Sequence, residues 1–300
     1  MIMKKTILSG IVLTIGCVAS HQSIAGITVS IVAGQDRAAS SVTATGSIEH
    51  IITDAEKATF GLGDNQLKNA VNAYFGKKPN DAYLHSPTPW GDLYKTYSWS
   101  QVKMVMVVQD ANIISLTSDP IIVKTQNFEN NSSQTGDFSV SVSDTVSNTV
   151  SSNWSKGGTF TIGQKFEYGV SFLGTGAKGE TSMSYSQSWG IGGQKSKNIT
   201  VGSTSGVSVQ LKPCQSIAAE LSASRGVMKV RLKYKGYLIG NTAVNYNPRH
   251  KGHHFWSLGI NNVMRTAGIP TSIYSTEDIE IGYYSNSTVK LKDKLSSSCK

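Results

Sequence analysis

The sequence has no hydrophobic run long enough to cross a bilayer as a helix, which takes about 20 apolar residues. Only 16% of its 300 residues are charged, and helical periodicity is nearly absent after residue 80. These absences exclude a helical membrane protein and a helical bundle. What remains is rich in Ser, Thr, Asn and Gly and alternates in many short runs, which is typical of a mainly β protein.

The first 25 residues have the order of a secretory signal peptide. A basic start with Lys4 and Lys5 precedes the uncharged run 6–18, and Ser23–Ile24–Ala25 forms a small-x-small cleavage signal before Gly26. The apolar run is too short for a membrane anchor. A lipoprotein signal ending at Cys17 is an alternative, but it lacks the usual Leu three places earlier. We therefore expect a secreted, extracellular protein.

Cysteine is scarce, and only Cys214 and Cys299 follow the signal peptide. An even count and an oxidising destination predict one disulfide between them, and two unpaired thiols are the alternative. Removing residues 1–25 takes away two lysines and lowers the formal net charge from +9 to +7. This charge favours anionic surfaces. The sequence lacks the basic helix with interleaved aromatics of a nucleic-acid binder, so no nucleic-acid partner is expected.

Catalytic motifs are missing as well. The sequence contains no Gly-x-Ser-x-Gly, no His-Glu-x-x-His and no phosphate-binding loop, so we expect neither an enzyme nor a cofactor. The segment Arg249–Trp256 holds His250, His253 and His254, but no carboxylate or cysteine lies near them. We therefore expect a solvated basic loop rather than a metal site. A role for these histidines in sensing pH remains an alternative.

Residues 64–75 predict a short helix with Asp64 or Asn65 as its cap and Gly76 as its stop, which places Leu67, Val71 and Tyr74 on one face. The segments 102–108 and 121–123 predict strands, and 138–151 predicts one long strand with a hydroxyl face. Between the helix and these strands lies an aromatic stretch that could bind a receptor or glycan, or could equally be head-domain packing. Its candidate receptor-binding residues are Tyr83, Trp90, Tyr94, Tyr97 and Trp99.

The most informative segment is an amphipathic hairpin at 159–191. Apolar side chains hold the even positions from 160 to 172, and after a Gly-rich tip they hold the odd positions from 183 to 191. Pairing residues whose numbers sum to 351 places Gln164 opposite Gln187 and Phe166 opposite Tyr185, with the turn at Thr175–Gly176. Two strands of about 9–11 residues suit a barrel that spans a bilayer, although a half-buried hairpin alternates in the same way.

One face of this hairpin is predicted to meet lipid and the other to line water. The membrane-inserting face comprises Phe160, Ile162, Phe166, Tyr168, Val170, Phe172, Leu173, Met183, Tyr185, Trp189 and Ile191. The pore-lining face comprises Lys165, Glu167, Ser171, Lys178, Glu180, Ser182, Ser184 and Ser186. A single hairpin cannot close a barrel, so this interpretation requires a homo-oligomer of several copies.

Residues 128–240 resemble the clostridial epsilon-toxin and mosquitocidal-toxin family of aerolysin-like β-pore-forming toxins. The matching features are Asn130–Ser133, the strand Phe138–Trp154, the hairpin Gly163–Tyr185, the return Lys195–Ser208 with Val209–Pro213, and the alternating Val227–Tyr237. The resemblance implies an elongated all-β molecule that is secreted, binds a receptor, forms a ring and inserts the hairpin. Cys214 departs from the family pattern, and the N-terminal region aligns with nothing in it.

Together these features predict a mainly β, elongated aerolysin-like fold with long antiparallel strands and a small α-containing head. We expect a signal peptide at 1–25, a receptor-binding head at 26–125 and a β body with its C-terminal β region at 126–300. The expected function is that of a secreted β-pore-forming toxin that acts on a target-cell membrane. The expected partners are this membrane and a protein or glycan receptor on it. A secreted glycan-binding module or adhesin without pore activity is the alternative, and a hydrolase is a distant third. The basic tail 290–300 offers sites for proteolytic activation.

Overall fold

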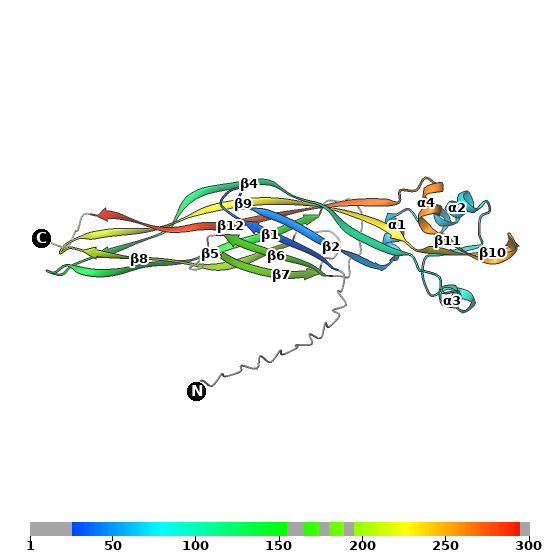
Figure 1. Cartoon of the computed structure of the whole chain (residues 1–300), viewed down its shortest axis with the longest axis horizontal. Coiled ribbons are helices and arrows are strands. Elements are labelled where there is room, and N and C mark those ends of the chain that lie inside the picture. The colour runs from blue at the N-terminus through cyan, green and yellow to red at the C-terminus, as the bar shows by residue number, and fades with distance from the viewer. Residues whose placement is uncertain (1–25, 155–164, 174–179, 189–194, 295–300) are drawn as a thin grey trace, which may run out of the picture.

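The computed structural model describes residues 26–154, 165–173, 180–188 and 195–294. The molecule is elongated, with long strands running along its axis and the helices gathered at one end (Figure 1). The mainly β fold with long antiparallel strands and a small helical head is thus confirmed. The signal peptide predicted at 1–25 and Cys299 lie outside the described residues.

The body is a nine-stranded sheet in the order β7-β6-β1-β2-β4-β9-β12-β5-β8. Its strands are β1 (Ile27–Ala33), β2 (Ser41–Ile51), β4 (Lys103–Glu129), β5 (Gly136–Trp154), β6 (Lys165–Leu173), β7 (Glu180–Ser188), β8 (Lys195–Leu211), β9 (Ser216–Ile239) and β12 (Ser272–Lys294). All their pairings are antiparallel except that of β1 with β6.

The head combines helices with a small three-stranded sheet in the order β11-β10-β3. Its elements are α1 (Asp54–Thr59), α2 (Asp64–Phe75), β3 (Asp81–Tyr83), α3 (Pro89–Thr96), β10 (Asn241–His250), β11 (His253–Gly259) and α4 (Ile260–Thr266). The division therefore differs from the expected ranges 26–125 and 126–300. Strands β1 and β2 belong to the body sheet, whereas β10, β11 and α4 pack in the head.

Four expected elements are confirmed, the helix with the expected bounds and the strands as parts of longer strands. The helix at 64–75 is α2, but its cap is Gly63 without a side-chain hydrogen bond, and Tyr74 is exposed while Ala70 is buried. The long strand at 138–151 is part of β5, and the strands at 102–108 and 121–123 are two parts of β4.

The body sheet curls so that its hairpin edge packs against its middle. Strand β6 lies five places from β12 in the sheet order, yet the Tyr168 hydroxyl of β6 reaches the Glu277 carboxylate of β12. Alternating residues of β1, β6, β9 and β12 fill the space between the two layers, as expected for strands with one inward face. The core of the body therefore includes part of the predicted hairpin.

Four chain segments join the body to the head, and all four belong to neighbouring strands. β2 passes into α1, β4 begins where β2 ends, β9 passes into β10 through Gly240, and β12 follows α4. Gly240 has a φ of +96°, and a Cβ atom there would lie 2.2 Å from the Gln101 carbonyl oxygen. Glycine is therefore required where these segments cross.

Candidate functional site

The predicted hairpin forms one edge of the body sheet. Strands β6 and β7 pair with each other, β6 pairs in parallel with β1, and β7 is the outermost strand among the described residues. The backbone hydrogen bonds of one strand, β1, therefore connect this hairpin to the rest of the sheet.

The predicted register of the hairpin is wrong by two residues. Phe166 lies opposite Gln187 and Tyr168 opposite Tyr185, so paired numbers sum to 353 rather than 351. A shift by two leaves every side chain on its own face, because strand side chains alternate with a period of two. The amphipathic pattern therefore specified the faces but could not distinguish these two registers.

The predicted apolar face of β6 is buried in this structure. Tyr168 and Val170 are 1% exposed and Phe172 is fully buried, whereas Gly169 and Ser171 between them are partly exposed. The Phe172 ring lies 6.3 Å from the ring of Tyr283 on β12. These three residues of the face predicted to meet lipid thus belong to the protein core in this conformation.

A buried carboxylate joins the hairpin to the body. Glu277 is fully buried and accepts hydrogen bonds from Tyr168 (2.9 Å), Tyr234 (2.7 Å) and Ser152 (2.5 Å). Burial raises the pKa of Glu277 to about 7, although the three hydroxyl donors oppose this shift. The pKa values of Tyr168 and Tyr234 are raised well above 10 by burial and by the nearby carboxylate, so both hydroxyls stay protonated.

This buried group was not predicted from the sequence. Glu277 stands in a Glu-Asp-Ile-Glu run that looks like a solvated strand edge. The alternation of β12 does place Glu277, Ile279 and Ile281 on one face, and all three are buried. A carboxylate on an otherwise apolar face was the available signal.

The remaining hairpin candidates are only partly described. Strands β6 and β7 contain the backbones of Lys165, Phe166, Glu167, Leu173, Glu180, Ser182, Met183, Ser184, Tyr185 and Ser186. Outside the described residues lie Phe160, Ile162, Lys178, Trp189 and Ile191. Their predicted roles in membrane insertion and pore lining remain predictions.

Of the five receptor-binding candidates, Tyr94 is buried, Tyr83 and Trp99 are partly buried, and Trp90 and Tyr97 are exposed. Tyr94 is 3% exposed, and its hydroxyl donates to the carbonyls of Tyr83 and Asn241, so it is a core residue of the head. The other four gather with Phe255 in what we call the aromatic cluster: Tyr83, Trp90, Tyr97, Trp99 and Phe255. Phe255 comes from β11 and was not predicted.

Two members of the aromatic cluster are prominently exposed. Trp90 is 46% and Tyr97 49% exposed. Trp90 has a φ of 61° and the following Gly91 and Asp92 are also left-handed, which interrupts α3 at its start. Such strain is uncommon and marks candidate functional sites. The ring of Trp90 lies 5.1 Å from that of Phe255, and Tyr97 stacks on Trp99 at 4.9 Å.

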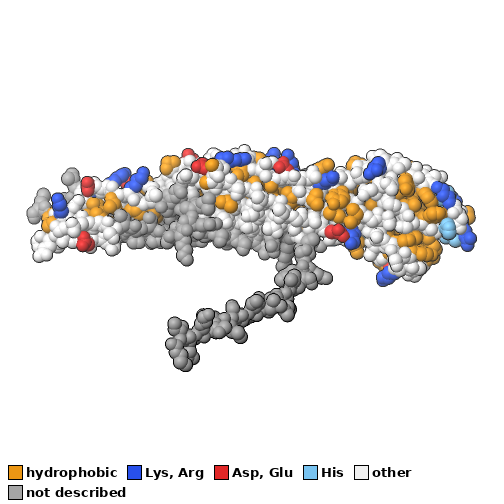
Figure 2. All heavy atoms as spheres, in the orientation of Figure 1, with side chains coloured by type: hydrophobic (Ala, Val, Ile, Leu, Met, Phe, Trp, Pro, Cys, Tyr) orange, Lys and Arg blue, Asp and Glu red, His pale blue; other side chains and the backbone are white. Residues whose placement is uncertain are grey.

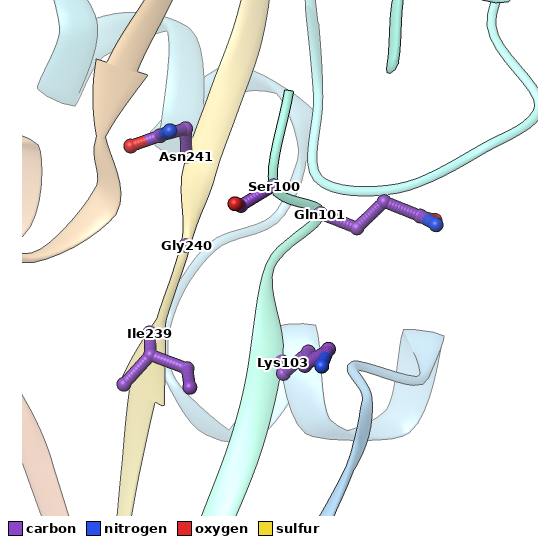
Figure 3. A pocket seen from close by; sticks show the side chains of 6 residues that line it. All are labelled: Ser100, Gln101, Lys103, Ile239, Gly240 and Asn241. Atoms are coloured by element: carbon purple, nitrogen blue, oxygen red, sulfur yellow. The ribbon is translucent and has the colours of Figure 1, made fainter. Parts of the chain in front are cut away.

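A pocket of about 490 Å3 lies at the junction of body and head. It is lined by Ser100, Gln101, Lys103, Ile239, Gly240 and Asn241 (Figure 3). Its only charged lining residue, Lys103, pairs with Glu49 at 2.7 Å. The pocket therefore holds no group arranged for acid–base or nucleophilic chemistry.

The described ranges contain no group of three His, Cys, Asp or Glu residues that could hold a metal ion. His250 and His254 instead contact backbone carbonyl oxygens, those of Phe75 at 3.2 Å and Tyr246 at 2.7 Å. Over the same part of the chain, no helix has the length and apolar character needed to cross a membrane.

Comparison with known proteins identifies relatives of this architecture. The profile of the family described as Clostridium epsilon toxin ETX/Bacillus mosquitocidal toxin MTX2 matches residues 68–296. U-megalopygitoxin(8)-Mc8 of Megalopyge crispata is 33% identical over 83% of this chain and 86% of its own length. U-megalopygitoxin(8)-Mo15 of Megalopyge opercularis is 34% identical over 81% of this chain and 77% of its own.

Among solved structures, the parasporin-2 toxin of Bacillus thuringiensis, described as recognising cancer cells, has the same fold. It superimposes with a TM-score of 0.56 and 14% identity over 83% of this chain and 99% of its own. The family match covers most of the described body and head, and the sequence resemblance is thereby confirmed. The chain belongs to the Clostridium epsilon toxin ETX/Bacillus mosquitocidal toxin MTX2 family of aerolysin-like toxins.

Proposed function

We propose that this chain is a secreted β-pore-forming toxin that binds a target-cell membrane, assembles into a ring of several copies and inserts the hairpin 159–191 as part of a transmembrane barrel. Its membership of a toxin family supports a toxin rather than an enzyme. The observation that carries the proposal is the docked strand β6, in which Tyr168, Val170 and Phe172 are buried while Gly169 and Ser171 on the other face are partly exposed.

Moving this hairpin from protein to lipid is energetically plausible. The side chains of Val170 and Phe172 would exchange one apolar environment for another, because lipid tails are about as apolar as a protein core. The Tyr168 hydroxyl would give up its hydrogen bond to Glu277. A further cost falls on the backbone, since unpaired N–H and C=O groups are not tolerated in hydrocarbon. Hairpins from several copies would satisfy these groups by closing into one barrel.

The head is the proposed receptor-binding part. The exposed Trp90 and Tyr97 of the aromatic cluster support this role, because exposed aromatics commonly anchor interfaces. The proposed receptor is a protein or a glycan. If the chain only binds its target and forms no pore, it is the adhesin of the alternative interpretation.

The disulfide between Cys214 and Cys299 is also a proposal. The register of β12 with β9 places Lys294 opposite Ser216. In the sequence, Cys214 shortly precedes Ser216 and Cys299 shortly follows Lys294, which supports a bond between the two cysteines. Such a bond would retain the tail after a proteolytic cut within 290–300.

A reversible tether tests whether the hairpin must leave the body. Val32 of β1 lies opposite Ser171 of β6, and adjacent strands are about 4.8 Å apart, within the range for a disulfide. We expect the variant Val32→Cys/Ser171→Cys to release no dye from phosphatidylcholine and phosphatidylserine liposomes when oxidised. Reduction should restore release to the wild-type level.

Each single-cysteine variant, and the wild type with and without reductant, are the controls. They separate the tether from any effect of reducing a native disulfide. Undiminished release by the oxidised double variant would refute hairpin insertion. If the wild type binds target membranes but neither releases dye nor conducts across a bilayer, with or without trypsin, the adhesin interpretation holds instead.

A further inference from the structure

The far end of the head is built from two loops that are distant in sequence. One is the segment 76–80 after α2, and the other is the turn between β10 and β11. The Asn80 N–H donates to the Asn245 carbonyl at 2.9 Å, and the Asn247 N–H donates to Asn80 Oδ1 at 2.7 Å. The Tyr246 hydroxyl donates to the Lys77 carbonyl at 2.8 Å. These bonds fix one loop against the other.

Four cations converge on this end of the molecule, which we call the basic tip: Lys77, Lys78, Arg249 and Lys251. Lys77 is partly exposed and the other three are exposed. Figure 2 shows Lys, Arg and His side chains gathered at this end. No carboxylate of the described residues lies within 4.0 Å of any of the four. The neighbouring Asp81 instead accepts from the Asn245 amide at 3.0 Å.

The basic tip differs in this respect from the middle of strand β9. On β9, Lys229, Arg231 and Lys233 pair with carboxylates at 3.0, 2.7 and 3.2 Å. Like charges held together without counter-charges repel one another, which disfavours the arrangement in the free protein. An anionic partner would remove this repulsion.

Two cations of the basic tip, Lys77 and Lys251, lie over packed aromatic rings. Lys251 Nζ lies 4.0 Å from the ring centre of Phe75, and Lys77 Nζ lies 5.9 Å from that of Tyr246. Phe75 in turn packs against Trp256 and His250 at 5.0 and 5.2 Å. Stacking on these rings orders two ammonium groups before any partner arrives.

The shape of this end favours a flat partner. The basic tip is the protruding end of an elongated molecule, and the pocket described above lies at the junction instead (Figures 2 and 3). Three of its four cations are lysines, which act as point charges without the planar fork of arginine. The exposed Trp90 and Tyr97 of the same head are residue types that prefer the membrane–water interface.

We propose that the basic tip binds the anionic phosphate headgroups of a lipid bilayer and so brings the head onto the target membrane. This inference rests on the proposed function, because it deepens the membrane-binding step of the toxin. Each basic residue near an anionic bilayer strengthens binding by about fivefold. The partner is thus a membrane that exposes anionic lipid.

The experiment compares two triple variants that lose the same charge. The tip variant is Lys78→Gln/Arg249→Gln/Lys251→Gln. The control variant is Lys212→Gln/Arg225→Gln/Lys290→Gln, which removes three exposed cations from the body. Binding is measured by co-sedimentation with vesicles of phosphatidylcholine alone or with added phosphatidylserine, at low and high salt. Thermal unfolding of each variant shows that the fold is retained.

We expect wild-type binding to require phosphatidylserine and to weaken with salt, as screening dictates. The tip variant should bind about 100-fold more weakly, from three charges at about fivefold each, and the control variant should stay close to wild type. Equal losses in both variants, or no loss in the tip variant, would overturn the proposal. Binding to soluble sulfated polysaccharide but not to these vesicles would also overturn it.

Dye release separates this inference from the proposed function. A wild type that binds anionic vesicles through the basic tip but releases no dye supports the inference and refutes the pore. A tip variant that binds and releases dye like the wild type refutes the inference and leaves the pore intact.

Discussion

Glu277 is fully buried, and only one of its three hydroxyl donors, Tyr168, belongs to the hairpin. Its pKa is raised from 4.5 to about 7, so the folded protein holds this proton more tightly than the unfolded chain. The groups around it are Tyr168, Tyr234, Ser152 and the adjacent Asp278. The contribution of Glu277 to stability is therefore complete below the unfolded pKa and is lost as the pH rises through about 7.

We expect the free energy of unfolding to show this loss between about pH 5 and about pH 8, on the order of 3 kcal/mol. Glu277→Gln should remove it, because the amide keeps an acceptor for the hydroxyls but does not ionise. Denaturant unfolding at several pH values measures the effect. Glu280→Gln, on the exposed face of the same strand, is the matched control and should keep the wild-type slope. An unchanged pH dependence in Glu277→Gln would show that other groups cause it.

At the level of single elements, the hairpin shows what an amphipathic pattern specifies. Alternation predicted the two strands and their faces, and Tyr168, Val170 and Phe172 are indeed on one buried face. The register was set from the match of Gln164 with Gln187, and the structure places Phe166 opposite Gln187 instead. The faces follow from local sequence, whereas the register also depends on how β6 pairs with β1.

A disulfide within the hairpin tests the observed register. Gly169 lies opposite Ser184, so Gly169→Cys/Ser184→Cys should oxidise readily, and Gly169→Cys/Ser182→Cys, which fits the sum of 351, should oxidise less. Titration of free thiols measures both. Because the hairpin is expected to move as a unit, the first bond should leave dye release intact, unlike the Val32–Ser171 tether. A preference for the second pair would favour the register predicted from sequence.

Other elements were predicted only in part, for reasons visible in the structure. Strand β4 was predicted as two strands because its register shifts at Val108/Asp110, Ile113/Ser115 and Ile122/Lys124, and each shift interrupts the alternation. Helix α2 was predicted closely, because its periodicity and the stop at Gly76 are local signals. Glu277 was missed because its burial depends on β6 packing over β12. The local signal, a carboxylate on an otherwise apolar face, does not reveal which strand covers that face.

At the scale of the whole molecule, the head is assembled from two separate parts of the chain. Tyr83 of β3 pairs with Ala243 of β10, about half the chain away. No sequence period marks such a pairing, so a boundary drawn at residue 125 separated elements that pack together. The same assembly brings Phe255 to Trp90 and Lys251 to Lys77, and the sequence alone revealed neither grouping.

The aromatic cluster leads to a prediction about cell binding. Trp90→Ala/Tyr97→Ala should weaken binding to target cells by about 10- to 100-fold, as expected when exposed aromatic anchors are truncated. Flow cytometry with labelled protein measures this, and circular dichroism confirms the fold. Tyr274→Ala, which removes a 59% exposed aromatic from the body, should bind normally. Normal cell binding by the double variant would exclude the aromatic cluster from receptor recognition.

The four segments that join head and body are adjacent, hydrogen-bonded strands at this junction. A ribbon of four paired strands resists bending and twisting far more than a single linker does, so the head does not rotate freely relative to the body. The angle that the head adopts on a surface therefore sets the angle of the whole elongated body. Neighbouring copies on one membrane would then stand parallel without any contact between them.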